Sequence, residues 1–225
     1  MNRLRRTVLH TTVLVAAAAA GVGAVQAATP AEVSKFFRAV TMNDARTVQA
    51  MLATTINPNQ INPIGGEPGL VLALREDSMD VFRVLLDHPA TRLETPAING
   101  NTALMMAAFK ANMPAAQALL AKGARVNQPG WTALHYAAAG GADDIARLLL
   151  QKGARIDAES PPASGQYTPL MMAAREGKES TVRLLLAAGA DARRKNSEDL
   201  TAAQIAERAE MPRIAAEIKQ YLATH

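Results

Sequence analysis

The sequence predicts an all-α fold in which pairs of short helices are stacked in a row. Residues 132–157 (TALHYAAAGGADDIARLLLQKGARID) and residues 168–191 (TPLMMAAREGKESTVRLLLAAGAD) place Thr, Leu, Ala-Ala, a small-residue break, Arg-Leu-Leu-Leu and Gly-Ala in the same order. One alanine also recurs at spacings of 34, 34, 30, 36 and 33 residues, as Ala39, Ala73, Ala107, Ala137, Ala173 and Ala206. Self-similarity with a period of about 20–50 residues indicates a stacked repeat architecture.

Residues 1–27 differ from the rest of the chain and are predicted to be a secretory signal peptide. A basic start is followed by the apolar, Ala-rich stretch 7–24, which contains no acidic residue, and then by the small residues of AVQA at 24–27. These features predict cleavage between Ala27 and Ala28. The alternative is a retained membrane helix, for which a stretch that contains His10 and three threonines is weakly hydrophobic. We therefore expect the mature protein in the periplasm or secreted.

Each repeat unit is predicted to contain two helices. The first is expected to begin after a threonine, whose hydroxyl accepts a hydrogen bond from a free N–H group of the opening turn. The threonines are Thr102, Thr132, Thr168 and Thr201. The second helix carries leucines on its buried stripe and is expected to stop at a glycine in the left-handed conformation. The glycines are Gly123, Gly153 and Gly189, and Pro89 takes this place in an earlier unit, so a different exit is expected there.

The connectors between units vary in length. Thr132 follows Gly123 by nine positions, Thr168 follows Gly153 by fifteen, and Thr201 follows Gly189 by twelve. The segment 124–130 is therefore short, and the segment 154–166 is long and rich in Pro, Ser and Gly. A long connector of this composition is either a surface feature for a partner or a tolerated insertion.

The pattern Thr-x-Leu-His/Met-x-Ala-Ala, a Gly break, Leu-Leu-Leu and Gly-Ala-Asp at about 33 residues resembles the ankyrin repeat. The resemblance implies an ankyrin-repeat solenoid, a curved stack of helix-turn-helix pairs with short β-hairpin-like fingers. It also implies one ankyrin repeat domain over 28–225. That domain would comprise an N-cap unit 31–66, repeats 67–100, 101–130, 131–166 and 167–199, and a C-cap unit 200–225.

The chain departs from the family pattern at the histidine that ties neighbouring units together. This histidine is present only as His135, and its place is taken elsewhere by Val71, Met105, Met171 and Gln204. We therefore expect fewer polar ties between units and more apolar contact.

Charge and cysteine content narrow the possible partners. The whole chain carries a net charge of +4, and removal of residues 1–27, with three Arg and no acid, leaves 21 basic and 20 acidic residues, or +1. A nearly neutral protein lacks the positive surface that nucleic-acid binding requires. The chain has no Cys, so stability must come from packing. We expect no nucleic acid, no membrane contact after cleavage, and a monomer.

The sequence offers no catalytic constellation. His88, His135 and His225 are far apart, and none has a ligand-type residue at metal-site spacing. The adjacent carboxylates Asp143 and Asp144 favour a helix start rather than acid–base catalysis. We expect a protein that is not an enzyme and has no catalytic residues, no metal site and no cofactor.

An alternative is a Met/His-based periplasmic protein that binds a metal or small ligand. Met105-Met106 and Met171-Met172 occupy matching positions, and thioethers bind soft copper. Core packing is the simpler interpretation of Met106 and Met172, because the aligned residues Leu72, Tyr136 and Ile205 are all apolar or aromatic.

The function implied by the resemblance is a non-catalytic protein-protein interaction module, which binds another protein through its concave face and finger tips. That partner would be an exported enzyme that the protein either supports or inhibits. Aromatic and Arg side chains supply most interface energy, so candidates lie in the variable positions. The candidates are Phe109, Lys110, Trp131, Tyr167, Arg175, Glu176, Arg193 and Arg194. Structural alternatives remain: Trp131 packing across the next finger, and a merely solvated run at 193–195.

Overall fold

The computed structural model describes residues 28–225, in which twelve α-helices and one 3₁₀ turn follow one another. The predicted signal peptide, residues 1–27, lies outside the described residues. The elements are α1 (Pro30–Thr41), α2 (Ala45–Leu52), α3 (Gly69–Arg75), α4 (Met79–Asp87), α5 (Ala103–Phe109), α6 (Met113–Ala121), α7 (Ala133–Gly140), α8 (Asp143–Gln151), η1 (Pro162–Ser164), α9 (Pro169–Arg175), α10 (Glu179–Ala187), α11 (Ala202–Arg208) and α12 (Pro212–Thr224).

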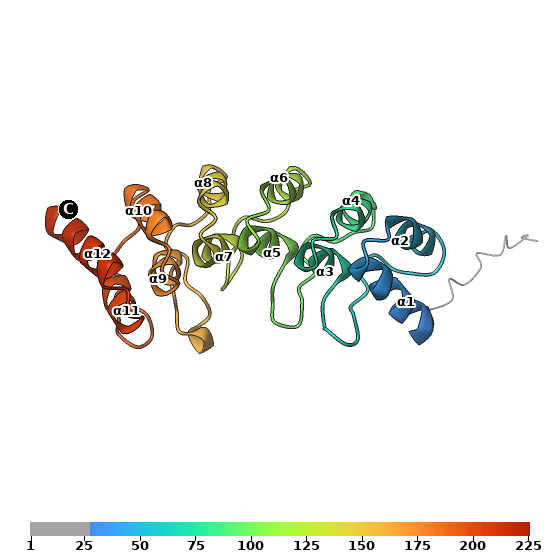
Figure 1. Cartoon of the computed structure of the whole chain (residues 1–225), viewed down its shortest axis with the longest axis horizontal. Helices are drawn as coiled ribbons and strands as arrows, with labels where there is room; N and C mark the ends of the chain where they lie inside the picture. The colour runs from blue at the N-terminus through green and yellow to red at the C-terminus, as the bar shows by residue number, and fades with distance from the viewer. Residues whose placement is uncertain (1–27) are drawn as a thin grey trace, which may run out of the picture.

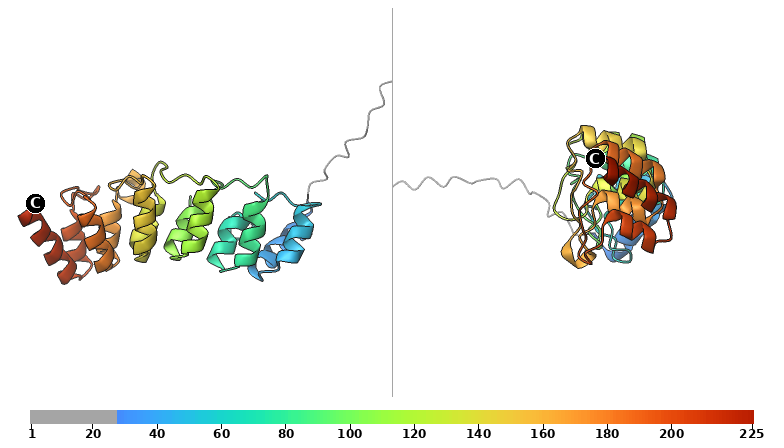
Figure 2. Two further views of the ribbon diagram at one scale, coloured as in Figure 1. Left: turned by 90° about the horizontal axis from the view of Figure 1, so that it is seen from above. Right: turned by 90° about the vertical axis from the view of Figure 1, so that its left-hand side faces the viewer.

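The helices form two rows in an elongated stack. Figure 1 shows the odd-numbered, inner helices in one row and the even-numbered, outer helices in the other, with the connectors projecting beyond the inner row. The stack bends in a shallow arc toward the connectors, and Figure 2 shows its narrow cross-section. The predicted all-α solenoid is confirmed. Within residues 28–225 the fingers form only the isolated bridges Ile61–Pro68 and Lys195–Thr201, and no sheet.

The first helix of each of the last four units begins after the expected threonine, but the expected hydroxyl cap forms only at Thr168 and Thr201 and not at Thr102 or Thr132. Thr102, Thr132, Thr168 and Thr201 are the N-cap residues of α5, α7, α9 and α11. The hydroxyl oxygen of Thr168 accepts the Met171 N–H at 3.3 Å, and that of Thr201 accepts the Gln204 N–H at 3.4 Å. The extended backbone of each cap turns the chain from the connector into the helix.

The recurring alanine marks the turn between the two helices of a unit. Its carbonyl accepts the backbone N–H of the residue five positions later. The pairs are Ala39–Asp44, Ala73–Ser78, Ala107–Asn112, Ala137–Ala142, Ala173–Lys178 and Ala206–Met211, at 2.7–2.9 Å. The turn requires a left-handed residue just before the donor, and the six residues at this position are Asn43, Asp77, Ala111, Gly141, Gly177 and Glu210.

The second helices end in the two ways that the sequence indicates. Gly123, Gly153 and Gly189 have φ of 92°, 82° and 91°, so the expected left-handed closure is confirmed. Helix α4 has no such glycine, and its C-cap residue His88 is extended. There the Thr91 hydroxyl donates to the Leu85 carbonyl at 2.6 Å. This side-chain donor replaces the backbone N–H that reaches the equivalent carbonyl in later units.

The core lies between the rows and is continuous along the stack. The leucines of the outer helices, such as Leu119, Leu149 and Leu185, are fully buried, as are the alanine pairs of the inner helices. The inner helices α5 and α7 approach each other closely at Gly140. A Cβ atom added to Gly140 would lie 2.7 Å from the Phe109 carbonyl oxygen, so only glycine fits there without a shift.

Polar ties between units are more numerous than the loss of histidine suggests. In four consecutive connectors, a side-chain oxygen accepts a backbone N–H of the next connector at 2.7–3.1 Å. The donor–acceptor pairs are Arg92–Asn59, Arg125–Glu94, Arg155–Asn127 and Asp191–Asp157. The expectation of fewer polar ties thus concerns the histidine position, whereas the connectors add polar ties at other positions, as Asn127 does beside the tie made by His135.

The long connector 154–166 is an ordered part of the stack. Ser160 is buried, and its hydroxyl oxygen accepts the Tyr167 N–H at 2.9 Å. Pro161 lies against Gly130 of the preceding connector, since a Cβ atom on that glycine would be 2.9 Å from Pro161 Cγ. The Gly165 carbonyl accepts the Ser197 N–H of the following connector. The insertion therefore packs on both neighbours.

We expect Ala111→Gly to raise the free energy of unfolding by about 0.5–1 kcal/mol. Relief of the left-handed conformation contributes about 1–2 kcal/mol, and the greater freedom of the unfolded chain opposes it by about 0.4–1 kcal/mol. Ala111 has φ of 52° and is exposed, so no buried contact is lost. Urea unfolding measures the change. The reverse change Gly153→Ala, at φ of 82° with open space around the added Cβ, should lower stability by a similar amount. Equal midpoints for all three proteins would contradict this account.

Candidate functional site

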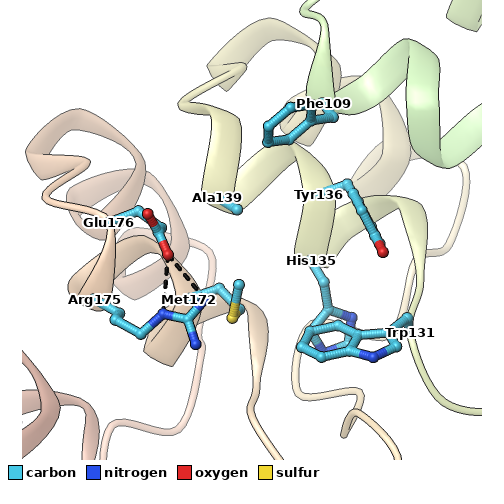
Figure 3. Close-up of a pocket in the computed structure, with 8 residues that line it drawn as sticks. All are labelled: Phe109, Trp131, His135, Tyr136, Ala139, Met172, Arg175 and Glu176. Atoms are coloured by element: carbon cyan, nitrogen blue, oxygen red, sulfur yellow. Dashed lines mark hydrogen bonds and ion pairs between the residues drawn. The ribbon is translucent and has the colours of Figure 1, made fainter. Parts of the chain in front are cut away.

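A pocket of about 400 Å³ opens on the inner row where α5, α7 and α9 lie side by side. It contains four of the sequence-predicted candidates, Phe109, Trp131, Arg175 and Glu176. The other lining residues are His135, Tyr136, Ala139 and Met172. Figure 3 shows Met172, Arg175 and Glu176 on one side and Trp131, His135 and Tyr136 on the other, with Ala139 between them.

One wall of the pocket is aromatic. The ring of Tyr136 meets Phe109 and Trp131 edge-to-face, at centroid distances of 6.3 and 6.2 Å. The Tyr136 hydroxyl donates to the Asn101 side-chain oxygen, and burial raises the pKa of this hydroxyl. Phe109 stays 50% exposed. A fixed tyrosine thus supports two aromatic rings that retain free surface.

The opposite wall comes from α9 and carries a charge pair. The Arg175 guanidinium lies 2.9 Å from the Glu176 carboxylate and 5.2 Å from the centre of the Tyr167 ring. These contacts hold Arg175 at the rim and neutralise the only carboxylate among the lining residues. Met172, below the pair, is buried and offers a polarizable thioether to the pocket.

His135 lies at the base of the aromatic wall and ties two units together. Its Nδ1 accepts the Thr132 N–H at 3.1 Å, so Nε2 carries the proton and donates to the Tyr167 carbonyl at 2.9 Å. The ring is fully buried, and this burial lowers the pKa of His135 to about 4. The imidazole is therefore neutral at pH 7, and both of its nitrogens form hydrogen bonds that stabilise the fold.

In two other units a methionine stands at the position of His135 and makes only one of the two hydrogen bonds that the histidine makes. The Sδ atoms of Met105 and Met171 accept the N–H groups of Thr102 and Thr168, each at 3.4 Å. A thioether has no proton to donate, so this side chain cannot reproduce the bond to the next connector. Both methionines are buried. No group of three or more His, Cys, Asp or Glu suited to a metal ion occurs within residues 28–225.

Tyr167 is not the exposed aromatic that its position before Thr168 suggested. Its side chain is only 7% exposed, because the long connector folds over the ring. A Cβ atom on Gly165 would lie 2.6 Å from the Tyr167 ring, which shows how closely the connector covers it. Trp131 occupies the same position after the short connector and remains half-buried. Connector length thus decides which of the two aromatics is accessible.

The remaining candidates lie outside the pocket. Lys110 follows Phe109 at the C-cap of α5 and is exposed. Arg193 and Arg194 lie on the last connector, where Arg193 is exposed and Arg194 pairs with Glu159 at 2.5 Å. This last pair joins neighbouring connectors, which accounts for part of the basic run as a structural contact.

Sequence reasoning missed several residues of functional interest. Tyr136, assigned to the core, is half-buried and lines the pocket. Ile64 and Ile98 are 92% and 87% exposed on neighbouring connectors. Their hydrophobic side chains within polar connector sequence are the signal that could have identified them.

The chain belongs to the ankyrin repeat family. The family described as "Ankyrin repeats (3 copies)" matches residues 36–129, 70–160 and 117–196. No helix among residues 28–225 is long and apolar enough to cross a membrane.

Three relatives illustrate how widely the repeat is used. The chain is 30% identical over 160 residues to the human transient receptor potential cation channel subfamily A member 1, covering 68% of this chain and 14% of the channel. It is 35% identical over 136 residues to Protein glp-1 of Caenorhabditis elegans, covering 54% of this chain and 10% of that protein. It is 43% identical over 83 residues to palmitoyltransferase Hip14 of Drosophila melanogaster, covering 36% of this chain and 13% of that protein. The similarity thus spans 14% or less of each relative's length.

We expect His135→Met to change how stability depends on pH. The unfolded histidine binds a proton near pH 6.5 and the folded one near pH 4, so the wild type loses stability as pH falls through this window. The loss amounts to roughly 3 kcal/mol, and the variant lacks it. Urea unfolding at pH 7 and pH 4 should show the difference between wild type and variant shrinking by this amount. A difference that is constant with pH would contradict the assigned tautomer and burial.

Proposed function

We propose that the protein is a non-catalytic binding module that recognises one partner protein through its concave face and finger tips. Ankyrin repeats generally mediate protein–protein interaction, and the family is typically non-catalytic. The observation that carries the proposal is the aromatic pocket on the inner row, with Phe109 and Trp131 only partly covered. Partly exposed aromatic side chains above a rigid support are typical of binding hot spots.

We further propose that residues 1–27 direct export to the periplasm and that the mature protein acts there as a monomer. A cut between Ala27 and Ala28 is compatible with the start of α1. Thr29 caps this helix and receives a reciprocal bond, because its N–H donates to the Glu32 carboxylate at 2.7 Å. The cut leaves both residues of this capping box on the mature chain.

Export has a direct test. Residues 1–27 fused to a reporter enzyme that is active only outside the cytoplasm should give activity, and the mature chain should begin at Ala28 by N-terminal sequencing. Replacement of Arg3, Arg5 and Arg6 by glutamate should abolish this activity, because the basic start is an essential part of such signals. An inactive wild-type fusion would contradict the proposed location.

The partner is proposed to be an exported enzyme, which the protein either supports or inhibits. If the pocket on the inner row binds a residue of the enzyme's active site, the protein inhibits the enzyme. If the inner row instead covers an unstable surface of the enzyme, the protein stabilises it. Both outcomes use the same docking face. Activity of the captured enzyme, measured with and without the repeat protein, decides between them.

The docking face is tested by affinity capture from a periplasmic extract. We expect Phe109→Ala to reduce the affinity for the partner by at least about fivefold, because truncation of a central aromatic typically costs more than about 1 kcal/mol. Gln151→Ala, at the exposed end of the outer helix α8, is the control and should capture as the wild type does. Equal capture by both variants would show that the partner does not dock on the inner row at Phe109.

Within residues 28–225, no observation favours the alternative of a Met/His-based metal- or ligand-binding protein. The thioethers of Met105 and Met171 and the Nδ1 of His135 accept the N–H groups of the threonines that precede inner helices, and the Nε2 of His135 donates to the Tyr167 carbonyl.

A further inference from the structure

We propose that the pocket between α5, α7 and α9 receives one large apolar side chain from an acidic segment of the partner protein. This inference rests on the proposed protein-binding function and specifies the chemistry that the docking face recognises. It follows from the lining of the pocket, from the charge at its rim, and from the connector that leaves it open.

The lining selects an apolar group. Phe109, Trp131 and Tyr136 present aromatic surface, and Ala139 and Met172 complete the base. The volume of about 400 Å³ lies near the lower end of the range for small-ligand sites, which run from about 300 to 1,000 Å³. A single aromatic or long aliphatic side chain suits a pocket of this size. The half-exposed Phe109 ring gains most from being covered.

The charge at the rim selects acidic neighbours for that side chain. Lys110 follows Phe109 directly, and the stem of Lys178 lies against the turn after α7, since a Cβ atom on Gly141 would be 3.1 Å from its Cδ. Among residues 28–225, neither lysine has a carboxylate within ion-pair distance. Arg175 already neutralises Glu176. Neither lysine lines the pocket, but Lys110 directly follows the lining residue Phe109 and Lys178 comes two residues after Glu176, so two positive charges without ion-pair partners lie next to lining residues in the chain.

Two other carboxylates begin α8, near the turn that the Lys178 stem covers. Asp144 pairs with Arg147 at 3.2 Å, whereas Asp143 accepts a hydrogen bond from the neutral Thr181 hydroxyl at 2.5 Å and keeps its negative charge. Lys110, on the Phe109 side, has no such carboxylate in the same turn, so an acidic segment meets complementary charge there and a basic segment would be repelled. Such complementarity governs specificity and the rate of association more than affinity.

The short connector explains why the pocket is found in this unit. The segment 124–130 leaves Trp131 half-buried, whereas the long connector of the next unit covers Tyr167. The two aromatics occupy equivalent positions, so the covered ring shows what a longer connector would do here. Trp131 therefore stays accessible to a partner, whereas the equivalent Tyr167 is covered by its connector.

The experiment is selection of random twelve-residue peptides, displayed on phage, against the purified protein. We expect the enriched peptides to share an aromatic or long aliphatic residue with aspartate or glutamate beside it. Trp131 is the only tryptophan of the chain, so its fluorescence reports directly on occupation of the pocket by the synthetic peptide. Enrichment without acidic residues, no enrichment, or an unchanged Trp131 spectrum at saturation would overturn the proposal.

Charge variants separate the rim from the general docking face. Lys110→Glu should weaken the selected peptide by about fivefold in low salt and by less in high salt, because exposed charges are screened. Lys152→Glu makes the same charge change at the exposed C-cap of α8 and should leave binding unchanged. If both variants weaken peptide binding equally, the effect comes from the net charge of the protein, and the proposed role of Lys110 beside the pocket is wrong.

The two proposals fail in different ways. If partner capture survives Phe109→Ala, the docking face itself is wrong. If capture is lost with Phe109→Ala but neither capture nor peptide binding responds to Lys110→Glu, the docking face stands and the acidic segment is wrong. Circular dichroism of Phe109→Ala and Lys110→Glu should match the wild type, because both side chains are exposed and leave the core intact.

Discussion

The close approach of consecutive inner helices is the constraint on which the rest of the structure depends. The alanine pairs of these helices are fully buried, and Gly140 lies so near the Phe109 carbonyl that a methyl group would not fit. Small residues allow this spacing, and the leucines of the outer helices then fill the wider space between the rows. Because each unit is packed against its neighbours, position within the unit determines which side chains face solvent.

The sequence predicted what is local or repeated and missed what depends on connector packing. The threonine N-cap positions and the left-handed glycines follow from short motifs, the tie that His135 makes between units follows from the family resemblance, and the structure bears them out. The exit after α4 was anticipated only as different, since Thr91 gives no hint in sequence that its hydroxyl reaches the Leu85 carbonyl. Periodicity specifies contacts between equivalent positions, and connectors of unequal length break that equivalence.

The candidate site shows the same division. Phe109, Trp131, Arg175 and Glu176 were selected as variable residues next to the repeat core, and they meet in one pocket because three inner helices align them. Tyr167 was selected by the same rule and is covered, because the fifteen-residue spacing from Gly153 provides enough chain to fold over it. The exposure of each aromatic side chain therefore depends on the length of the connector before it. The sequence pattern gives this length but does not specify the path that the connector takes.

The candidate site lies where the repeat is irregular in length, and the regular core of the repeat does not determine its position. The spacing between the marker alanines is shortest, at 30 residues, from Ala107 to Ala137, which is the junction of α5 and α7. The short connector still ties this unit to the next, because Asn127 accepts the Arg155 N–H and His135 donates to the Tyr167 carbonyl. The shortened connector leaves an aromatic surface open between two longer ones. A stack whose units are tied by these polar contacts can thus vary one connector, and with it one binding surface, without disturbing its core.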